Sequence, residues 1–366
     1  AMCIWPAIHM GITSLIPTQY MDILFFMAVP VFFYLFYQVL MRAEDPLGVI
    51  QKFLLVFALY VAVPPFVELI TGIQFVSASD ELAIKEGSLK GLFFNPNNLA
   101  ATAVCLAPAI LFFFQLQGRK HKEKLLGWGL YLLLGMAIFV CVSRTAIACY
   151  LLISLIYIAY RKNGFITVIA TGLLALILLM IPSRVIAEFL LSLNGNPFLE
   201  RFSSRVYLFL FDLDSDNSVS YRQEIYNYFW NNPPLLLTGY GPKNFRDYFG
   251  GHLSNSLGFE NPHSFIIELY LGFGIISLLG FIAFVAFYFL YTASSRALTN
   301  KSRVLAWVTL GIFLLAGFIP STILRMPFIW LPCLLIYIYS AFVASKLQNQ
   351  AAYTYSYTPS KTKGIS

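Results

Sequence analysis

Three residues of this sequence have side chains that could together hold a diphosphate and move a proton. Arg144 lies in "CVSRTAIACYLL", Arg222 lies in "YRQEIYNYFW", and His263 precedes the apolar run "SFIIELYLGFGIISLLGF". A planar guanidinium binds phosphate oxygens in pairs and stays charged at any relevant pH. A neutral imidazole can take a proton from a sugar hydroxyl near physiological pH. If the three side chains meet, they could bind a sugar diphosphate and activate the hydroxyl that attacks it.

Each of the three residues also has an ordinary explanation when it is taken alone. Arg144 could be an arginine that extends to the membrane surface, and Arg222 could be a surface arginine paired with Glu224. His263 could be a histidine that the start of a helix favours for its hydrogen bonds. A shared function requires that all three lie on one side of the membrane, which depends on the helices that carry them.

The composition indicates an all-α protein that crosses a membrane several times. Of its 366 residues, 59% are hydrophobic and only 11% are charged. This balance is typical of polytopic membrane proteins. The net charge of +7 therefore does not indicate a nucleic-acid partner, because Lys and Arg mark the cytoplasmic loops of membrane proteins. The five cysteines have no metal-ligand spacing, and we interpret them as small buried apolar residues.

Apolar runs predict nine transmembrane helices, and a tenth candidate occupies the first 17 residues. A helix needs about 20 apolar residues to cross the hydrocarbon core. The runs lie near 22–41, 53–73, 98–117, 125–142, 145–160, 165–182, 264–291, 304–320 and 328–345. We expect residues 1–182 to form the N-terminal transmembrane helices and residues 264–345 to form the C-terminal ones.

Basic residues between the runs predict which connections face the cytoplasm. "GRKHKEK" (118–124), "RKNG" (161–164) and "RALTNKSR" (296–303) lie on alternating connections and therefore share the cytoplasmic side. The extracytoplasmic side then receives the long segment 183–263. Within this segment, the pattern of "YRQEIYNYFWNNPPLLLTGYG" predicts an amphipathic helix followed by a Gly-rich turn. We therefore expect a partly helical loop that caps the bundle. Residues 346–366 are polar without periodicity and are predicted to form a disordered cytoplasmic tail.

This topology brings Arg144, Arg222 and His263 to the extracytoplasmic side. Lys90 and Arg325, with Lys85, could add positive charge around the same mouth, although each could instead be an interfacial anchor.

Other motifs offer competing sites on this side. "DLDSD" (212–216) could bind a divalent ion but is better explained as a solvated acidic turn. "GYG" (239–241) resembles a phosphate loop only loosely, and a chain reversal explains it better. His252 competes with His263 as the base but has no adjoining helix. We therefore expect no metal and no cofactor.

The motifs around the three residues also resemble a known family. "VSRTAIACYLLISL", "YRQEIYNYFWNNPPLLLTGYGPKNF" and "NPHSFIIELYLGFGIISLLGF" resemble, in order and approximate spacing, the O-antigen ligase and polysaccharide polymerase superfamily, and "FFNPNNLAATAVCLAPAILFF" is also similar to it. The resemblance implies that Arg144 and Arg222 bind a lipid diphosphate and that His263 activates the acceptor. Members of this family commonly have about a dozen spans, so the amino-terminal part of this chain departs from the family pattern.

The resemblance implies an inverting, metal-independent glycosyltransferase of the bacterial inner membrane. Its donor would be an undecaprenyl-diphosphate-linked glycan, and its acceptor would be a glycan or a lipid A core, as in lipopolysaccharide assembly. A polymerase uses the same chemistry with another lipid-linked repeat unit as acceptor, and the sequence does not separate the two. A lipid-linked glycan flippase or exporter is disfavoured because charged groups are scarce inside the spans, where Glu68 and Glu268 lie near outer ends.

Overall fold

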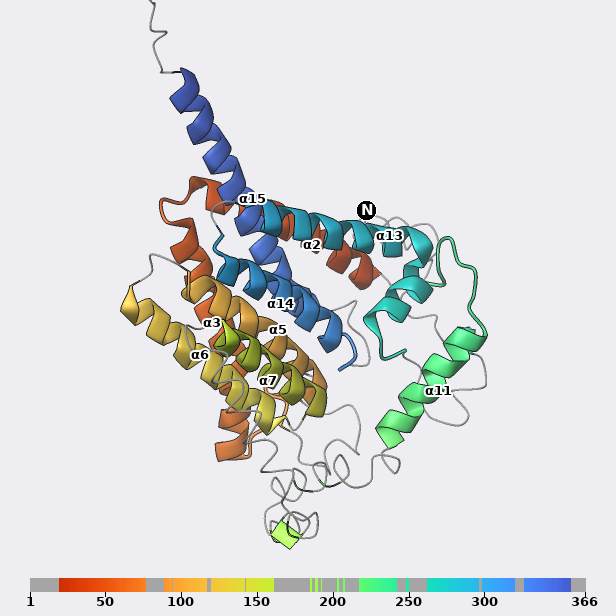
Figure 1. Cartoon of the computed structure of the whole chain (residues 1–366). Helices are drawn as coiled ribbons and strands as arrows, with labels where there is room; N and C mark the ends of the chain where they lie inside the picture. Colours follow the sequence, from red (N-terminus) through yellow and green to blue (C-terminus); the bar gives the residue numbers. More distant parts are fainter. Residues whose placement is uncertain are drawn as a thin grey trace, which may run out of the picture.

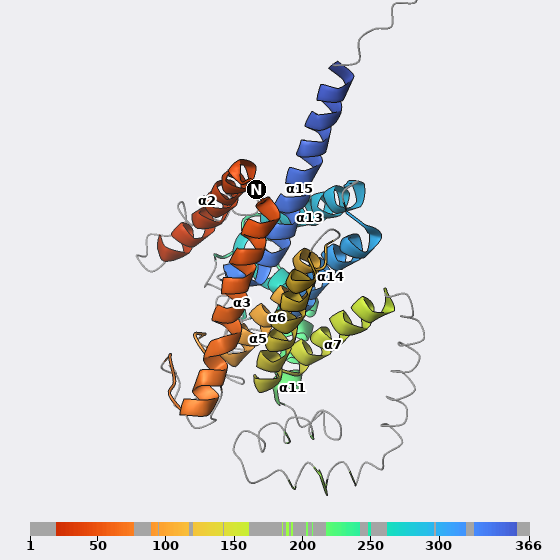
Figure 2. The ribbon, with the colours of Figure 1, turned by 90° about the vertical axis from the view of Figure 1, so that its left-hand side faces the viewer.

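The computed structural model describes residues 20–76, 89–93, 95–116, 120–141, 143–160, 217–241, 248–249, 262–295, 298–319 and 326–356, with a few single positions between 185 and 207. All regular structure among these residues is α-helical (Figures 1 and 2). The helices are α2 (Tyr20–Arg42), α3 (Pro46–Thr71), α5 (Pro96–Phe114), α6 (His121–Val140), α7 (Arg144–Ala159), α11 (Asn217–Asn231), α13 (Phe265–Ser294), α14 (Asn300–Ala316) and α15 (Pro327–Ser356).

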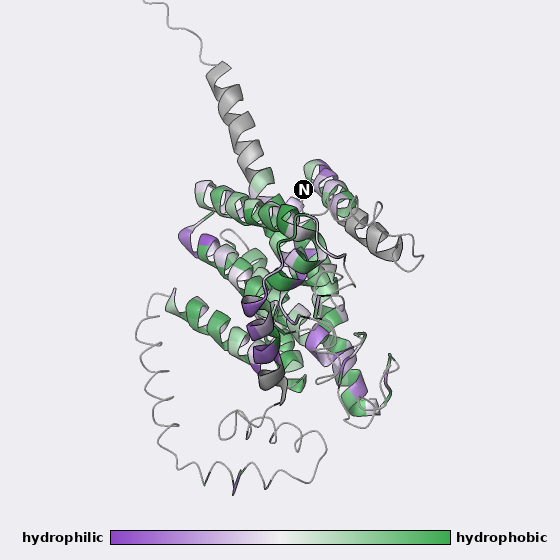
Figure 3. Cartoon of the chain, turned by 90° about the vertical axis from the view of Figure 1, so that its right-hand side faces the viewer, coloured by the Kyte–Doolittle hydropathy of each residue, from purple (hydrophilic) through white to green (hydrophobic). Residues whose placement is uncertain are grey.

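The fold is that of an all-α polytopic membrane protein, as the sequence predicted. Eight of the nine predicted spans coincide with described helices, whereas 165–182 and the candidate in the first 17 residues lie outside the described residues. Within the described residues, α3, α5, α6 and α13 are long and apolar enough to cross a membrane, and α7 is a shorter apolar helix. Figure 3 shows that hydrophobic residues dominate the helices of the bundle.

Local capping signals explain where two of these helices begin. The Asp45 side chain accepts a hydrogen bond of 3.0 Å from the Gly48 amide, and Pro46 occupies the first turn of α3. Asn95 caps α5 in the same way, with its side chain 2.8 Å from the Asn97 amide. Such caps satisfy amide groups that the first turn of a helix leaves unbonded.

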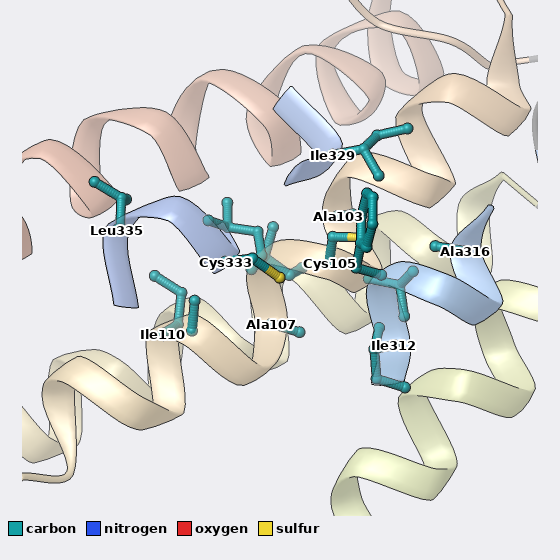
Figure 4. Packing of buried hydrophobic residues seen from close by; sticks show 14 of the residues in the cluster. Ala103, Cys105, Ala107, Ile110, Ile312, Ala316, Ile329, Cys333 and Leu335 are labelled. Atoms are coloured by element: carbon teal, nitrogen blue, oxygen red, sulfur yellow. The ribbon is translucent and has the colours of Figure 1, made fainter. Parts of the chain in front are cut away.

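Helix α5 forms the centre of the bundle. Every residue from Leu99 to Phe114 is buried, because α5 packs against α3, α6, α14 and α15. Figure 4 shows Cys105 of α5 and Cys333 of α15 among small and branched apolar side chains. The described cysteines, Cys105, Cys141, Cys149 and Cys333, are all buried, which agrees with their interpretation as small apolar residues.

Two reciprocal hydrogen bonds join α6 to α7. The Tyr150 hydroxyl donates to the Tyr131 carbonyl oxygen at 3.0 Å, and the Tyr131 hydroxyl lies 3.3 Å from the Tyr150 carbonyl oxygen. The two rings stack with centroids 4.6 Å apart, and Gly135 leaves room for the Tyr150 ring. The short connection between the helices and this contact fix where α7 begins.

Two features differ from the sequence prediction. The predicted span 264–291 agrees with α13 in extent, but Gly274 interrupts the helix with a φ of 72° and a ψ of −167°. Helix α15 continues to Ser356. It therefore includes residues 346–356, for which the sequence predicts a disordered tail. The sequence "SKLQNQAA" contains good helix formers, which explains the continuation. Figures 1 and 2 show this helix extending beyond the bundle.

Candidate functional site

The start of α7 and the end of α14 lie at the same end of the bundle. The Lys301 ammonium, near the start of α14, donates to the Tyr157 hydroxyl near the end of α7 at 2.9 Å. The two helices also pack along their lengths, so they run antiparallel. Arg144, the first residue of α7, therefore lies at the end of the bundle where α14 finishes.

The last residues of α14 contact both the start of α13 and the cap helix α11. The Phe265 amide donates to the Gly317 carbonyl oxygen at 3.2 Å, which brings the start of α13 to the end of α14. From α11, Arg222 Nη2 lies 3.5 Å from the Ile319 carbonyl oxygen. The segment Gly317–Ile319 thus joins the element that follows His263 to the element that carries Arg222.

His263 has an unusual backbone conformation at this junction. Its φ is 48°, and among the described non-glycine residues it alone has a positive φ. A residue with a side chain pays a steric cost for this conformation, so it persists only where surrounding contacts hold it. One such contact comes from the Tyr226 hydroxyl, which donates to the His263 carbonyl oxygen at 2.9 Å. Pro262 and Ser264, on either side of His263, are buried.

Tyr226 was not identified from the sequence, although helical spacing offered a signal. It follows Arg222 by four residues and therefore lies on the same face of α11. Its ring meets that of Phe318 edge to face, with centroids 6.3 Å apart. Burial raises the pKa of the Tyr226 hydroxyl, so this group keeps its proton and acts as a donor at neutral pH. Tyr226 thus connects α11, the His263 turn and the end of α14.

Burial and the nearby Arg222 lower the pKa of His263 to about 4. Burial is the larger cause, because a charged imidazolium is poorly solvated away from water, and the positive guanidinium adds repulsion. An unperturbed imidazole has a pKa near physiological pH, which is what the sequence predicted for His263. In the structure the imidazole is neutral at neutral pH and can accept a proton, but it is a weaker base than expected until a negative charge lies beside it.

Helix α11 docks on the first half of α13 through a small apolar cluster of its own. Ile225 and Phe229 of α11 pack with Ile267 and Leu271 of α13, and Phe249 completes the buried set. The opposite side of α11 is polar and exposed at Gln223, Glu224 and Asn227. The predicted amphipathic helix is therefore present, and it fixes Arg222 relative to the start of α13 (Figure 1).

The Gly-rich segment after α11 fills the break in α13. The amides of Tyr240 and Gly241 donate to the carbonyl oxygens of Leu271 and Gly272 at 2.7 and 2.8 Å, and the Ile275 amide donates to the Leu236 carbonyl oxygen at 3.1 Å. These bonds satisfy polar groups that the interrupted helix leaves unpaired inside an apolar environment. Two of the three amides of "GYG", those of Tyr240 and Gly241, are thus used within the fold, which supports the chain-reversal interpretation over a phosphate loop.

Glycines permit the close approach at this break. Gly239 has a φ of 78°, and a Cβ added to it would lie 2.5 Å from the backbone of Gly272 and Phe273. A Cβ at Gly274 would lie 2.3 Å from the Leu237 carbonyl oxygen. We refer to the contact between residues 236–241 and residues 271–275 as the glycine clasp.

Lys90 is buried rather than exposed at the mouth of the bundle. Its side chain is only 2% exposed, and its amide donates to the Glu68 carboxylate at 2.9 Å. The same carboxylate accepts bonds from the amides of Gly91 at 2.7 Å and Phe75 at 3.2 Å. Glu68 therefore fixes the connection between α3 and α5, a role that the sequence analysis did not identify. The start of α15 is close by, since the rings of Phe93 and Phe328 lie 6.2 Å apart.

Several candidates from the sequence lie outside the described residues. These are Arg325, Lys85, His252 and the acidic residues Asp212, Asp214 and Asp216. Among the residues that the structure describes, no group of three or more His, Cys, Asp or Glu side chains is arranged to hold a metal ion. The described part of the candidate site therefore consists of Arg222, Tyr226 and His263, with Arg144 at the same end of the bundle.

Comparison with known families agrees with the resemblance seen in the sequence. Residues 129–282 match the family described as O-antigen ligase. The matched segment includes Arg144, Arg222, Tyr226 and His263, whereas Lys90 and Arg325 lie outside it. No curated protein matches the chain.

Proposed function

We propose that this chain is a membrane glycosyltransferase of the O-antigen ligase superfamily, a proposal that the family match over residues 129–282 supports. It transfers a glycan from an undecaprenyl-diphosphate carrier to an acceptor hydroxyl at the extracytoplasmic face of the bacterial inner membrane. One observation carries the proposal: Arg222 and His263 come from distant segments, yet both lie at the end of α14. Arg222 Nη2 is 3.5 Å from the Ile319 carbonyl oxygen, and the Phe265 amide, two residues after His263, donates to the Gly317 carbonyl oxygen.

In this proposal the two arginines bind the donor diphosphate. Arg222 and Arg144 offer guanidinium groups that pair with phosphate oxygens and stabilise the charge that develops as the diphosphate leaves. The bond between the anomeric carbon and the diphosphate oxygen breaks, and the electron pair leaves with the undecaprenyl diphosphate. The diphosphate also places negative charge near His263.

His263 acts as the general base in this proposal. The acceptor hydroxyl gives its proton to the neutral imidazole as its oxygen bonds to the anomeric carbon from the face opposite the leaving group, which inverts the configuration. A pKa of about 4 makes His263 a poor base before the donor binds. The bound diphosphate offsets the charge of Arg222 and favours the imidazolium, so donor binding raises the pKa of His263. The base is thus strengthened when the donor is present.

A polysaccharide polymerase is the alternative function. It would use the same residues and chemistry with a second lipid-linked repeat unit as acceptor, in place of a lipid A core or another surface acceptor. A flippase or exporter of lipid-linked glycans would need polar groups along a path through the membrane. The described centre of the bundle is instead the apolar α5, whose residues from Leu99 to Phe114 are buried.

A reconstituted transfer assay tests this proposal. Purified protein is mixed with a lipid-linked oligosaccharide and candidate acceptors, and the products are resolved on a gel. One discrete shift of the acceptor indicates ligation, and a ladder indicates polymerisation. The His263→Ala variant should abolish transfer while it still binds the lipid-linked donor. Transfer at the wild-type rate by this variant would remove His263 from the mechanism, and no product with any acceptor would favour transport.

A further inference from the structure

The second half of α13 is long enough to cross the membrane alone. Gly274 divides α13 into Phe265–Phe273 and Ile275–Ser294. About 20 helical residues rise about 30 Å, which is the thickness of the hydrocarbon core, whereas the first half rises only about 14 Å. Figure 1 shows the first half turning away from the direction of the second half, toward the end of α14. The break at Gly274 therefore leaves a second half whose length matches the thickness of the hydrocarbon core.

Three large apolar side chains are exposed beside this break. Leu235 is 99% exposed, Trp230 is 73% exposed and Leu237 is 65% exposed. The glycine clasp holds Leu236 between the two exposed leucines, through the bond from the Ile275 amide to its carbonyl oxygen. The Tyr270 hydroxyl donates to the Pro234 carbonyl oxygen and accepts from the Leu236 amide at 3.2 Å. Leu235 and Leu237 are therefore fixed in exposed positions rather than placed on a loose loop.

These side chains continue an exposed apolar surface on the second half of α13. Beyond the break, α13 exposes Leu279 and Ile282, at 57% and 54%, on a helix of spanning length. Exposed leucines on such a helix face hydrocarbon, and the clasp joins Leu235 and Leu237 to its outer end. Tryptophan is enriched where a membrane meets water, because its ring is apolar and its N–H is polar. The chemistry of this surface fits the extracytoplasmic leaflet of a bilayer.

We propose that Trp230, Leu235 and Leu237 form a lipid anchor that seats the cap in the extracytoplasmic leaflet. The cap here comprises α11, residues 232–241 and the first half of α13. Arg222 is part of the cap, and His263 immediately precedes the first half of α13, so the anchor sets how deep both residues lie relative to the membrane surface. In terms of the proposed function, the diphosphate of a lipid-linked donor lies at this same depth in the membrane. The anchor itself does not depend on that function.

Site-specific fluorescence in a bilayer tests the anchor. Leu235→Cys and, separately, Leu237→Cys are labelled with the fluorophore NBD, in full-length protein with Cys3→Ser. The other cysteines, Cys105, Cys141, Cys149 and Cys333, are buried and should not react. Glu224→Cys, on the exposed polar side of α11 and about 120° around the helix from Trp230, is the matched control. Each protein is placed, one copy per disc, in phosphatidylcholine nanodiscs that contain lipids with a nitroxide near the headgroup.

The anchor predicts strong quenching by the nitroxide lipid and weak quenching by iodide at positions 235 and 237. The control at position 224 should show the reverse. Iodide quenching at 235 and 237 equal to that at 224 would show that the segment lies in water and would overturn the proposal. Protection from both quenchers in single-copy discs would mean that protein covers the side chains, which would also overturn it.

Intrinsic fluorescence provides a second measurement that needs no cysteine. Trp230→Phe should remove a nitroxide-quenched component from the tryptophan emission, and no change in the quenched fraction would contradict the anchor. None of these measurements involves glycan transfer. Lipid quenching in a protein that transfers no glycan would therefore support the anchor and contradict the proposed enzyme. Glycan transfer without lipid quenching would support the enzyme and contradict the anchor.

Discussion

The Tyr226 hydroxyl and the His263 carbonyl oxygen lie 2.9 Å apart, and this hydrogen bond ties the cap helix to the turn that presents the imidazole. We therefore expect Tyr226 to act as a positioning residue. Tyr226→Phe keeps the ring against Phe318 but removes the donor. A hydrogen bond of this kind contributes about 1 kcal/mol, so kcat should fall about fivefold. The KM for the lipid-linked donor should change little, because the arginines that bind it remain.

The matched control for this variant is Tyr228→Phe. Tyr228 lies on the same helix, but its ring contacts Tyr248 and Phe249 instead of the turn at His263. Steady-state kinetics with both variants separate positioning from general loss of structure. Equal losses of kcat in the two variants would show that Tyr226 has no special relation to the base.

Arg222 should control the pH at which the free enzyme loses activity. Its positive charge lowers the pKa of His263, so removal of the charge in Arg222→Gln should raise that pKa. The acidic limb of kcat/KM should then move to higher pH. Arg222→Lys keeps the charge but loses the paired hydrogen bonds, so its acidic limb should stay near the wild-type position while donor binding weakens. A limb that moves equally in both variants would contradict an electrostatic cause.

His263 should also make the protein less stable in mild acid. Its pKa is about 4 in the folded protein and 6.5 in an unfolded chain. Between these values the unfolded chain binds more protons, so the free energy of unfolding falls as the pH is lowered from about 6.5 to about 4. The shift corresponds to about 3 kcal/mol at most. In thermal unfolding in detergent, His263→Gln should lose stability less steeply over this range than the wild type, and parallel curves would refute the assignment.

The glycine clasp should not tolerate a side chain at Gly274. A Cβ there would lie 2.3 Å from the Leu237 carbonyl oxygen, and the positive φ disfavours other residues. Gly274→Ala should therefore destabilise the protein by more than about 2 kcal/mol and reduce transfer, because the cap loses its attachment. Gly311→Ala in α14 is the control, since a Cβ there meets nothing within 4 Å. Thermal unfolding should show little change, or a small gain, for the control.

Transfer should survive removal of divalent ions. In the proposed mechanism, Arg144 and Arg222 supply the positive charge that neutralises the donor diphosphate. EDTA should therefore leave the transfer rate nearly unchanged. The measurement is the transfer rate with EDTA against the rate with added Mg²⁺ or Mn²⁺. Strict dependence on an added ion would direct attention to Asp212, Asp214 and Asp216.

The sequence predicted the helices well because their signals are local. Long apolar runs and caps such as Asn95 with Pro96 define an element without reference to the rest of the chain. The break at Gly274 had no such signal, because a glycine within an apolar helix more often allows close packing. The residues that fill the break lie more than 30 positions upstream, and only the folded chain reveals the pairing.

The sequence offered candidate site residues by their chemistry, but it did not predict their geometry. Arg222 and His263 could be chosen for their chemistry and their side of the membrane. The contact of Tyr226 with the His263 carbonyl depends on how α11 docks, and the low pKa of His263 depends on burial. Lys90 shows the opposite case, since a lysine expected at an exposed mouth is buried near the carboxylate of Glu68.

The bond between the Gly241 amide and the Gly272 carbonyl oxygen also closes a loop of chain, because residue 241 follows α11 and residue 272 lies in the first half of α13. Phe249 attaches this loop a second time, since it packs with Ile225 and Leu271. Lengthening a closed loop costs little, about 0.6 kcal/mol for each doubling. An insertion into this loop that spares residues 248–249 should therefore cost little stability and leave Arg222 and His263 in place.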